Sequence, residues 1–157
     1  MAKANTRDFE IYVEILADGT ADNQTLDMTD YVDIADNQAF EVHEVDVVLD
    51  PGESFPSVNS EFVFQLADSN IQTFVSHADR TSLYVARQTF DSATLGMWHQ
   101  ESFSSLTPLI VSKTLFCRNH MVSGTQKDFT LRMKGRIVSP SAKDYMALVL
   151  TQTGNVA

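Results

Sequence analysis

The sequence predicts an all-β protein built from short strands, either a β-sandwich or a β-barrel. Apolar and polar residues alternate with a period of two in run after run, and turn signals separate the runs. No segment shows the 3.6-residue period of a long helix, and we expect less than about a tenth of the residues to be helical. Regular short strands without helices are typical of sandwiches and barrels.

Charge is divided unequally along the chain. Up to Glu61 there are 15 acidic and two basic residues, whereas from Phe62 onward there are nine basic and six acidic ones. Both parts carry the same alternating pattern, so the first part is not a disordered acidic tail. We therefore expect strands of the first part to lie beside strands of the second, which brings the two chain ends into one sheet.

The overall composition indicates a single folded domain. With 157 residues, 43% of them hydrophobic, we expect one domain over residues 1–157 with a short N-terminal arm over residues 1–7. The net charge of −10 opposes binding to a nucleic-acid backbone. Cys117 is the only cysteine, so an internal disulfide is excluded. Its apolar neighbours favour a buried, unreactive side chain. No apolar run is long enough for a membrane span and no secretory signal is recognisable, which favours synthesis in a cytoplasm.

The strands expected in the first part are separated by clear turn residues. Residues 18–38 are polar and rich in Asp, and we expect a long loop that holds one short strand. The sequence Asp50-Pro51-Gly52 marks a turn. The predicted strands are residues 9–15, the short strand within 18–38, and residues 40–49, 62–66 and 83–90.

In the second part the alternation is interrupted between residues 91 and 107, and Gly96 to His99 is expected to form a loop with exposed bulky side chains. Residues 109–116 form an apolar run typical of a central strand. Residues 129–137 are the cleanest amphipathic strand, and Gly135 on its inner face indicates a bulge or a close backbone approach.

The segment of residues 141–150 fits two structures. Ser141 and Asp144 have the spacing of a helix capping box, and Tyr145, Leu148 and Val149 have helical spacing. The same segment also alternates and is β-branched towards its end. We favour a turn followed by a final strand and keep the helix as the alternative.

No group of residues forms a recognisable catalytic, cofactor-binding or metal site. The four histidines His43, His77, His99 and His120 have no partner at metal-ligand spacing. The Asp residues of the loop 18–38 recur at every third position, which differs from a calcium loop, so solvated acids are favoured over an ion site. We expect no enzymatic activity and no cofactor.

Two further sets of residues are candidates for contacts, one between strands and one between subunits. The basic stripe Arg132, Lys134 and Arg136 is expected to pair with an acidic neighbouring strand rather than with phosphate. Met97, Trp98 and Phe103 are candidates for a subunit interface, where Met and aromatic residues are enriched, although core burial is an equal alternative.

Four segments carry a resemblance to a known family. Residues 29–51, 107–115 and 131–138, followed by residues 145–150, resemble the single jelly-roll capsid proteins of tailless icosahedral viruses of archaea and bacteria. The resemblance implies an antiparallel eight-stranded jelly-roll sandwich that assembles into a capsid lattice and has no enzymatic activity. In such a fold residues 40–50 are expected beside residues 127–138, which places Glu44 and Asp46 on the outer face with the basic stripe.

The resemblance also implies partners. We expect a homo-oligomer in a virion, made in the host cytoplasm, in contact with other capsid proteins. Only Lys3 and Arg7 precede the first strand, so direct nucleic-acid binding is not expected, and an inner membrane or a second protein layer would lie beneath the shell. The alternative is a lectin-like carbohydrate-binding module with Trp98 as an aromatic platform. Both functions fit the same sandwich.

Overall fold

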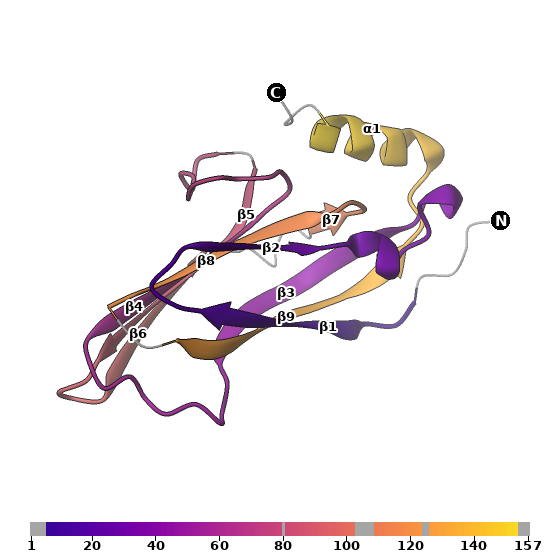
Figure 1. The fold of residues 1–157 in the computed structure, drawn as a ribbon. Coiled ribbons are helices and arrows are strands. Elements are labelled where there is room, and N and C mark those ends of the chain that lie inside the picture. Colours follow the sequence, from indigo (N-terminus) through magenta and orange to yellow (C-terminus); the bar gives the residue numbers. More distant parts are fainter. Residues whose placement is uncertain (1–5, 80, 103–108, 124–125, 154–157) are drawn as a thin grey trace.

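The computed structural model describes residues 6–79, 81–102, 109–123 and 126–153. Two antiparallel sheets pack against each other in two layers, and one helix lies outside them (Figure 1). The described strands are β1 (Phe9–Ala17), β2 (Asp22–Leu26), β3 (Ala39–Leu49), β4 (Ser60–Ala67), β5 (Ser82–Asp91), β6 (Gly96–Ser102), β7 (Leu109–Val111), β8 (Leu115–Val122) and β9 (Lys127–Val138). The helices are the 3-10 turns η1 (Met28–Asp30) and η2 (Ile34–Asp36) and the α-helix α1 (Ala142–Thr153).

The first sheet has four strands in the order β1-β9-β3-β7, and the second has five in the order β2-β8-β4-β5-β6. The prediction of an all-β sandwich is confirmed. The described strands number nine rather than the expected eight, because β6 pairs with β5 as an additional edge strand. Strand β9 lies between β1 and β3, so strands from the two differently charged parts of the chain are neighbours.

The core lies between the inner faces of the two sheets. Alternate residues of each central strand are buried, as the period-two pattern requires. Phe62 on β4 stacks on Phe129 on β9 across the two layers, with ring centroids 3.7 Å apart. The buried position predicted for Cys117 is confirmed, and this burial raises the pKa of its thiol to about 12.

Gly135 lies where two strands approach each other closely. Gly135 pairs with Val42, and the preceding residue, Lys134, pairs with Glu44. His43 is therefore an extra residue in β3. A Cβ atom at Gly135 would overlap the carbonyl oxygen of Glu41 and lie 2.9 Å from the ring of Phe40. The prediction of a bulge or a close backbone approach is therefore confirmed.

The final strand favoured for residues 141–150 is wrong, because residues 142–150 lie in α1. Ser141 Oγ accepts a hydrogen bond from the Asp144 amide and donates one to the Asp144 carboxylate, at 3.2 and 2.6 Å. This cap begins the helix, and Tyr145 N–H continues it by donating to the Ser141 carbonyl. Of the two structures that fitted the sequence, the capping box identified the correct one.

Two further expectations need correction. The run 109–116 is not one central strand: β7 is a short edge strand of the four-stranded sheet, and β8 is an inner strand of the other sheet. Residues between Val111 and Leu115 carry the chain from one layer to the other. The loop expected from Gly96 to His99 is instead the first half of β6.

Candidate functional site

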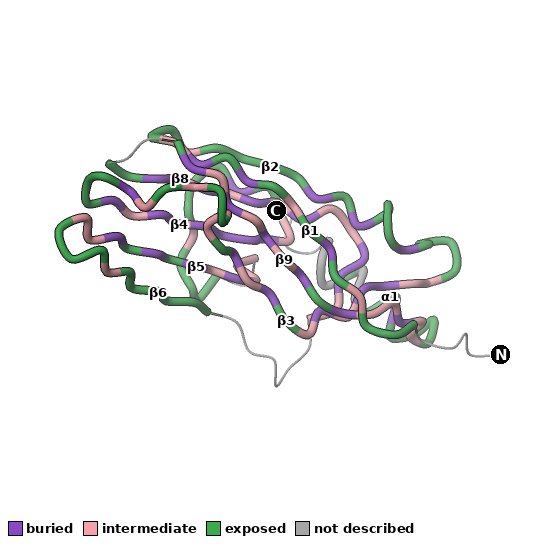
Figure 2. The backbone as a smooth tube through the Cα atoms, turned by 90° about the horizontal axis from the view of Figure 1, so that it is seen from below, coloured by how far each residue is buried: buried purple, intermediate pink, exposed green. Residues whose placement is uncertain are grey.

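Strand β6 is the outermost strand of the five-stranded sheet, and almost all of it is exposed. It pairs with β5 without a register shift, from Gly96 opposite Asp91 to Ser102 opposite Val85. Residues 97–102 are all exposed although they point alternately to the two faces of the sheet. Figure 2 shows β6 exposed along its length, whereas β4 and β5 beside it alternate between buried and partly buried or exposed residues. Strand β6 therefore extends the sheet beyond the part that the other layer covers.

Large apolar side chains lie on this strand and on the turn before it. The exposed fractions are 79% for Trp98, 52% for Met97 and 70% for Leu95. Phe103, the third residue proposed for an interface, lies outside the described residues. Core burial, the alternative for Met97 and Trp98, is excluded by these values. The two side chains point to opposite faces because they are consecutive residues of a strand.

A hollow of about 410 Å³ lies beside Trp98 on the five-stranded sheet. Its lining includes Asn59, Glu61, Asp91 and Val122. The Asn59 side-chain oxygen accepts hydrogen bonds from the amide and hydroxyl of Ser92, both 3.0 Å long. One oxygen of Asp91 accepts from Thr94 Oγ1 at 2.8 Å. These oxygens of Asn59 and Asp91 therefore accept hydrogen bonds from the neighbouring turn.

The opposite side of the sandwich is closed by hydrogen bonds between the two layers. Gln24 Nε2 on β2 donates to the Glu14 carbonyl on β1 at 3.2 Å. The Asn119 side chain donates to the Leu16 carbonyl at 3.3 Å, and Met121 N–H donates to the Asp18 carbonyl at 2.8 Å. These bonds satisfy backbone groups of β1 and of the loop after it.

On the side of β6, the two sheets are joined through β5, the strand next to β6. The buried side chain of Gln88 on β5 donates through Nε2 to the Val47 carbonyl on β3 at 2.6 Å. Strand β7 pairs only with residues 40–42 of β3, so the Val47 carbonyl lies beyond β7. The bond from Gln88 satisfies this carbonyl. The two layers therefore meet at β5 and β3, which leaves β6 outside the closed part of the sandwich.

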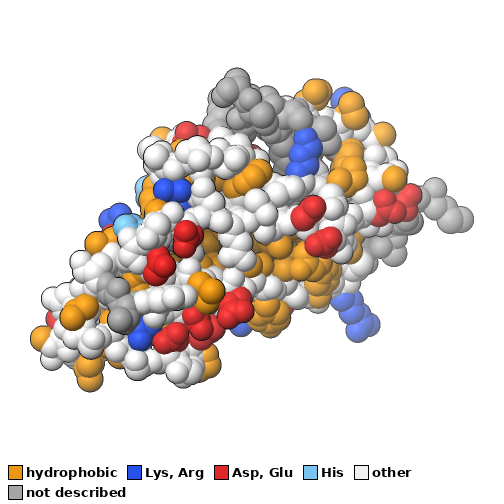
Figure 3. All heavy atoms as spheres, viewed as in Figure 1, with side chains coloured by type: hydrophobic (Ala, Val, Ile, Leu, Met, Phe, Trp, Pro, Cys, Tyr) orange, Lys and Arg blue, Asp and Glu red, His pale blue; other side chains and the backbone are white. Residues whose placement is uncertain are grey.

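The outer face of the four-stranded sheet carries charges in an acidic, basic, acidic order. Lys134 on β9 lies between Glu10 on β1 and Glu44 on β3. Arg132 lies opposite Asp46 and donates to both of its carboxylate oxygens, at 3.2 and 2.6 Å. On the face visible in Figure 3, acidic and basic side chains are interspersed around apolar side chains near the middle.

The third basic residue of the stripe, Arg136, also meets a carboxylate. Its guanidinium lies 3.0 Å from Glu41, the residue directly opposite on β3. The structure thus places Glu44, Asp46, Arg132, Lys134 and Arg136 together on one face. The sequence reasoning missed Glu10 and Glu41, because β1 was not expected beside the basic strand and the bulge changes which residues of β3 face outward.

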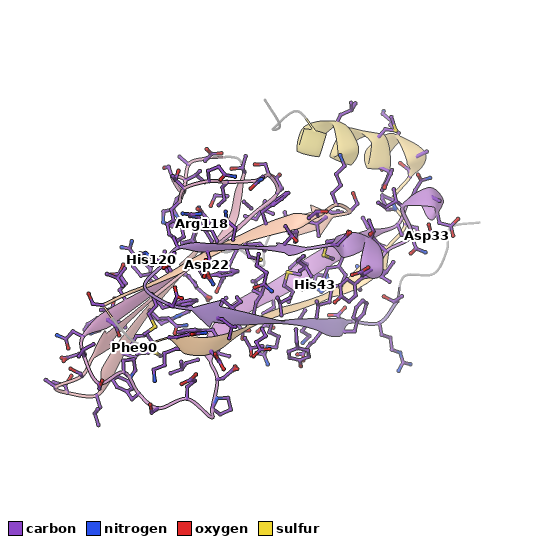
Figure 4. All side chains as sticks on the ribbon, viewed as in Figure 1. Asp22, Asp33, His43, Phe90, Arg118 and His120 are labelled. Carbon is purple, nitrogen blue, oxygen red and sulfur yellow. The ribbon has the colours of Figure 1, made fainter. Side chains whose placement is uncertain are left out.

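His43, the extra residue of the bulge, lies between two carboxylates. Its Nε2 is 2.6 Å from Glu41 Oε1 and its Nδ1 is 3.1 Å from Asp8 Oδ2. The hydrogen bond with Glu41 is the main cause that raises the pKa of His43, and the same bond lowers the pKa of Glu41. Figure 4 labels His43 on β3. No sequence pattern other than Gly135 indicated this cluster.

Two of the remaining histidines and two acidic residues of the loop 18–38 have structural contacts. His120 on β8 lies 3.0 Å from the Gly19 carbonyl, and His99 lies 3.4 Å from Glu101. Figure 4 labels Arg118 and His120 on β8 near Asp22, where β2 begins. In the loop 18–38, Asp27 and Asp33 cap the two 3-10 turns. No group of three or more potential metal ligands occurs among the residues that the structure describes.

No described helix has both the length and the hydropathy required to cross a membrane. Comparisons with protein-family models, with curated proteins and with solved structures find no match to this chain.

Proposed function

We propose that this chain is a viral structural protein that self-assembles into a capsid shell. The observation that carries the proposal is β6, a regular strand at a sheet edge that exposes both faces and the side chains of Met97 and Trp98. Met and aromatic side chains are enriched at protein–protein contact surfaces relative to the rest of the protein surface. The protein is proposed to act as a homo-oligomer within a virion.

The strand order supports a jelly roll as the finer description of the sandwich. When β6 is set aside, eight of the described strands remain, and the first pairs with the last, as β1 does with β9. The second pairs with the second-last, the third with the third-last and the fourth with the fifth. A long hairpin rolled into two layers produces this nested order. The capsid family that the sequence resembles is built on such a roll.

The charged face supports a shell that does not bind its genome directly. Arg132 and Arg136 are engaged by Asp46 and Glu41, and Lys134 lies between two glutamates. Few positive charges on this face are therefore free for phosphate groups. We propose that other capsid proteins, a second protein layer or an inner membrane lie next to the shell.

The size of the purified protein tests the proposal. Light scattering after size exclusion and negative-stain electron microscopy are expected to show capsomer rings or shells rather than monomers. A protein that stays monomeric at high concentration, over a range of salt and pH, would contradict self-assembly.

Trp98→Ala is expected to weaken association by about 2 kcal/mol, or about thirtyfold in Kd, because an exposed aromatic side chain is a typical interface anchor. Its melting temperature is expected to stay close to that of the unchanged protein. Thr89→Ala, opposite Trp98 on β5, is the matched control. Unchanged association in Trp98→Ala would remove Trp98 from the interface.

A carbohydrate-binding module is the second candidate, and the hollow beside Trp98 favours it. Glycan-array binding by a monomer, abolished in Trp98→Ala, would support this candidate over assembly. An assembled particle without glycan binding would support the first proposal.

A further inference from the structure

Among the described residues, the outer edge of β6 lacks most of the features that protect exposed strand edges, and Glu101 is its only charged residue. Its inner edge pairs with β5, and no described strand pairs with the outer edge. The strand contains no Lys and no Pro, and its register with β5 has no bulge. Unpaired N–H and C=O groups on such an edge can pair with another strand.

The other edges of the two sheets differ from β6. Strands β1 and β2 are joined by the bond from Gln24 to Glu14, and β7 has only three residues. Short edge strands and edges covered by neighbouring groups are common ways to prevent pairing between molecules. Only β6 combines length, regularity and exposure among the described edge strands.

Symmetry limits how β6 can pair with β6 of a second copy. A two-fold axis perpendicular to the sheet makes the two β6 strands antiparallel. The corresponding faces of the two sheets then lie on the same side of the joined sheet. Residues opposite each other must then come from the same face, because side chains alternate along a strand. One residue therefore lies opposite its own copy, with the axis midway between the two, and Trp98, His99 and Gln100 are the central choices in β6.

Two of these registers oppose unlike groups. An axis at His99 places two histidines opposite each other and Glu101 opposite Met97. An axis at Trp98 places Glu101 opposite Leu95, outside β6, and His99 opposite Met97. Each register leaves a carboxylate facing an apolar side chain, which gives no favourable cross-strand pair.

The register centred on Gln100 is complementary. It places His99 of each copy opposite Glu101 of the other, and the two Gln100 amides opposite each other. Trp98 then lies opposite Ser102, which leaves room for the indole ring. Because His99 already lies 3.4 Å from Glu101 in its own strand, the two copies would form a ring of alternating basic and acidic side chains.

We propose that β6 pairs with β6 of a second copy in an antiparallel arrangement with a two-fold axis between the two Gln100 residues. The two five-stranded sheets then form one continuous sheet across the interface. This inference rests on the proposed self-assembly and specifies one of its contacts.

Single cysteines along β6 test the register. Residues directly opposite in an antiparallel pair have Cα atoms about 4.5 or 5.5 Å apart, within the range for a disulfide. Gln100→Cys is expected to form a disulfide-linked dimer under mild oxidation, about tenfold more than Ser102→Cys, which faces Trp98 instead of itself. The native Cys117 gives little background because it is buried.

The outcomes separate this inference from the proposed function. Predominant crosslinking of Trp98→Cys or His99→Cys would overturn the register, and no crosslinking of any β6 cysteine in a protein that assembles would overturn the β6 contact alone. A protein that neither crosslinks nor assembles would contradict both proposals.

A charge pair provides an independent readout. His99→Glu places four carboxylates together in the proposed register, and the dimer dissociation constant is expected to rise about tenfold at low salt. His99→Lys places a permanent positive charge opposite Glu101 and is expected not to raise the dissociation constant by more than about twofold. Equal effects of the two substitutions would contradict the pairing of His99 with Glu101.

Discussion

Strands β9 and β6 are both regular and antiparallel, but their surroundings are opposite. Strand β9 has β1 on one side and β3 on the other, buries one face in the core and covers the other with ion pairs. Strand β6 has one neighbour, and both of its faces are exposed. Substitutions in β9 should therefore affect folding, whereas substitutions in β6 should affect contacts with other molecules.

Glycines in the two strands give the largest expected difference. Gly135→Ala on β9 is expected to lower the free energy of unfolding by about 3 kcal/mol, because the new methyl group would overlap the backbone of Glu41. Gly96→Ala on β6 meets only the side-chain oxygen of Thr94, at 3.0 Å, and is expected to cost less than about 1 kcal/mol. Urea denaturation of both variants measures the difference. Similar losses in the two variants would contradict the division between β9 and β6.

Charge reversal on β9 is expected to have an intermediate effect. Arg132→Glu with Lys134→Glu should destabilise the fold by about 1–2 kcal/mol at low salt, because each exposed pair contributes only about 0.2–1 kcal/mol. Adding Glu44→Lys and Asp46→Lys should restore part of the loss. Because Lys134 also faces Glu10, the further change Glu10→Lys should restore more. Urea midpoints at low and high salt measure these steps, and an effect that persists in high salt would point to lost packing instead.

The smallest expected effect is a pH dependence at the His43 bulge. The raised pKa of His43 contributes stability that is present below its ordinary pKa and is lost as pH rises through the folded value. The lowered pKa of Glu41 contributes stability that is present above its ordinary pKa and is lost as pH falls through the folded value.

Stability from this cluster is therefore expected to be greatest between about pH 4.5 and 6.5 and to fall by less than about 1 kcal/mol on the alkaline side. Denaturation midpoints at several pH values should show this fall in the unchanged protein and not in His43→Gln. A fall of the same size in His43→Gln would assign it to other groups.

Strands with one buried face could be predicted from the sequence. The alternation of Phe9, Ile11 and Val13 in β1, and of Phe129, Leu131 and Met133 in β9, reflects one face in the core. Residues 40–50, which were expected beside residues 127–138, do lie there. With the final segment helical, β9 is the last described strand and is flanked on both sides.

The features that were missed have no sequence pattern that identifies them, and the alternation in residues 145–150 was misleading. Strand β6 buries neither face, so its polar and apolar residues need not alternate. In α1, Tyr145 is buried while Met146 and Leu150 are exposed, so the apolar residues do not form a clean helical stripe. The cluster of Asp8, Glu41 and His43 depends on a one-residue bulge, which a sequence pattern does not locate.

The central place of β9 also has a consequence for synthesis of the chain. On the ribosome, β1 and β3 emerge long before β9, yet β9 is the strand that joins them. Translation proceeds at about 5–20 residues per second, so both strands wait several seconds with unpaired edges. A nascent chain stopped before Lys127 would contain the complete β6 edge but no strand between β1 and β3. The four-stranded sheet can therefore close only after β9 has been translated, and until then the nascent chain would be a target for chaperones.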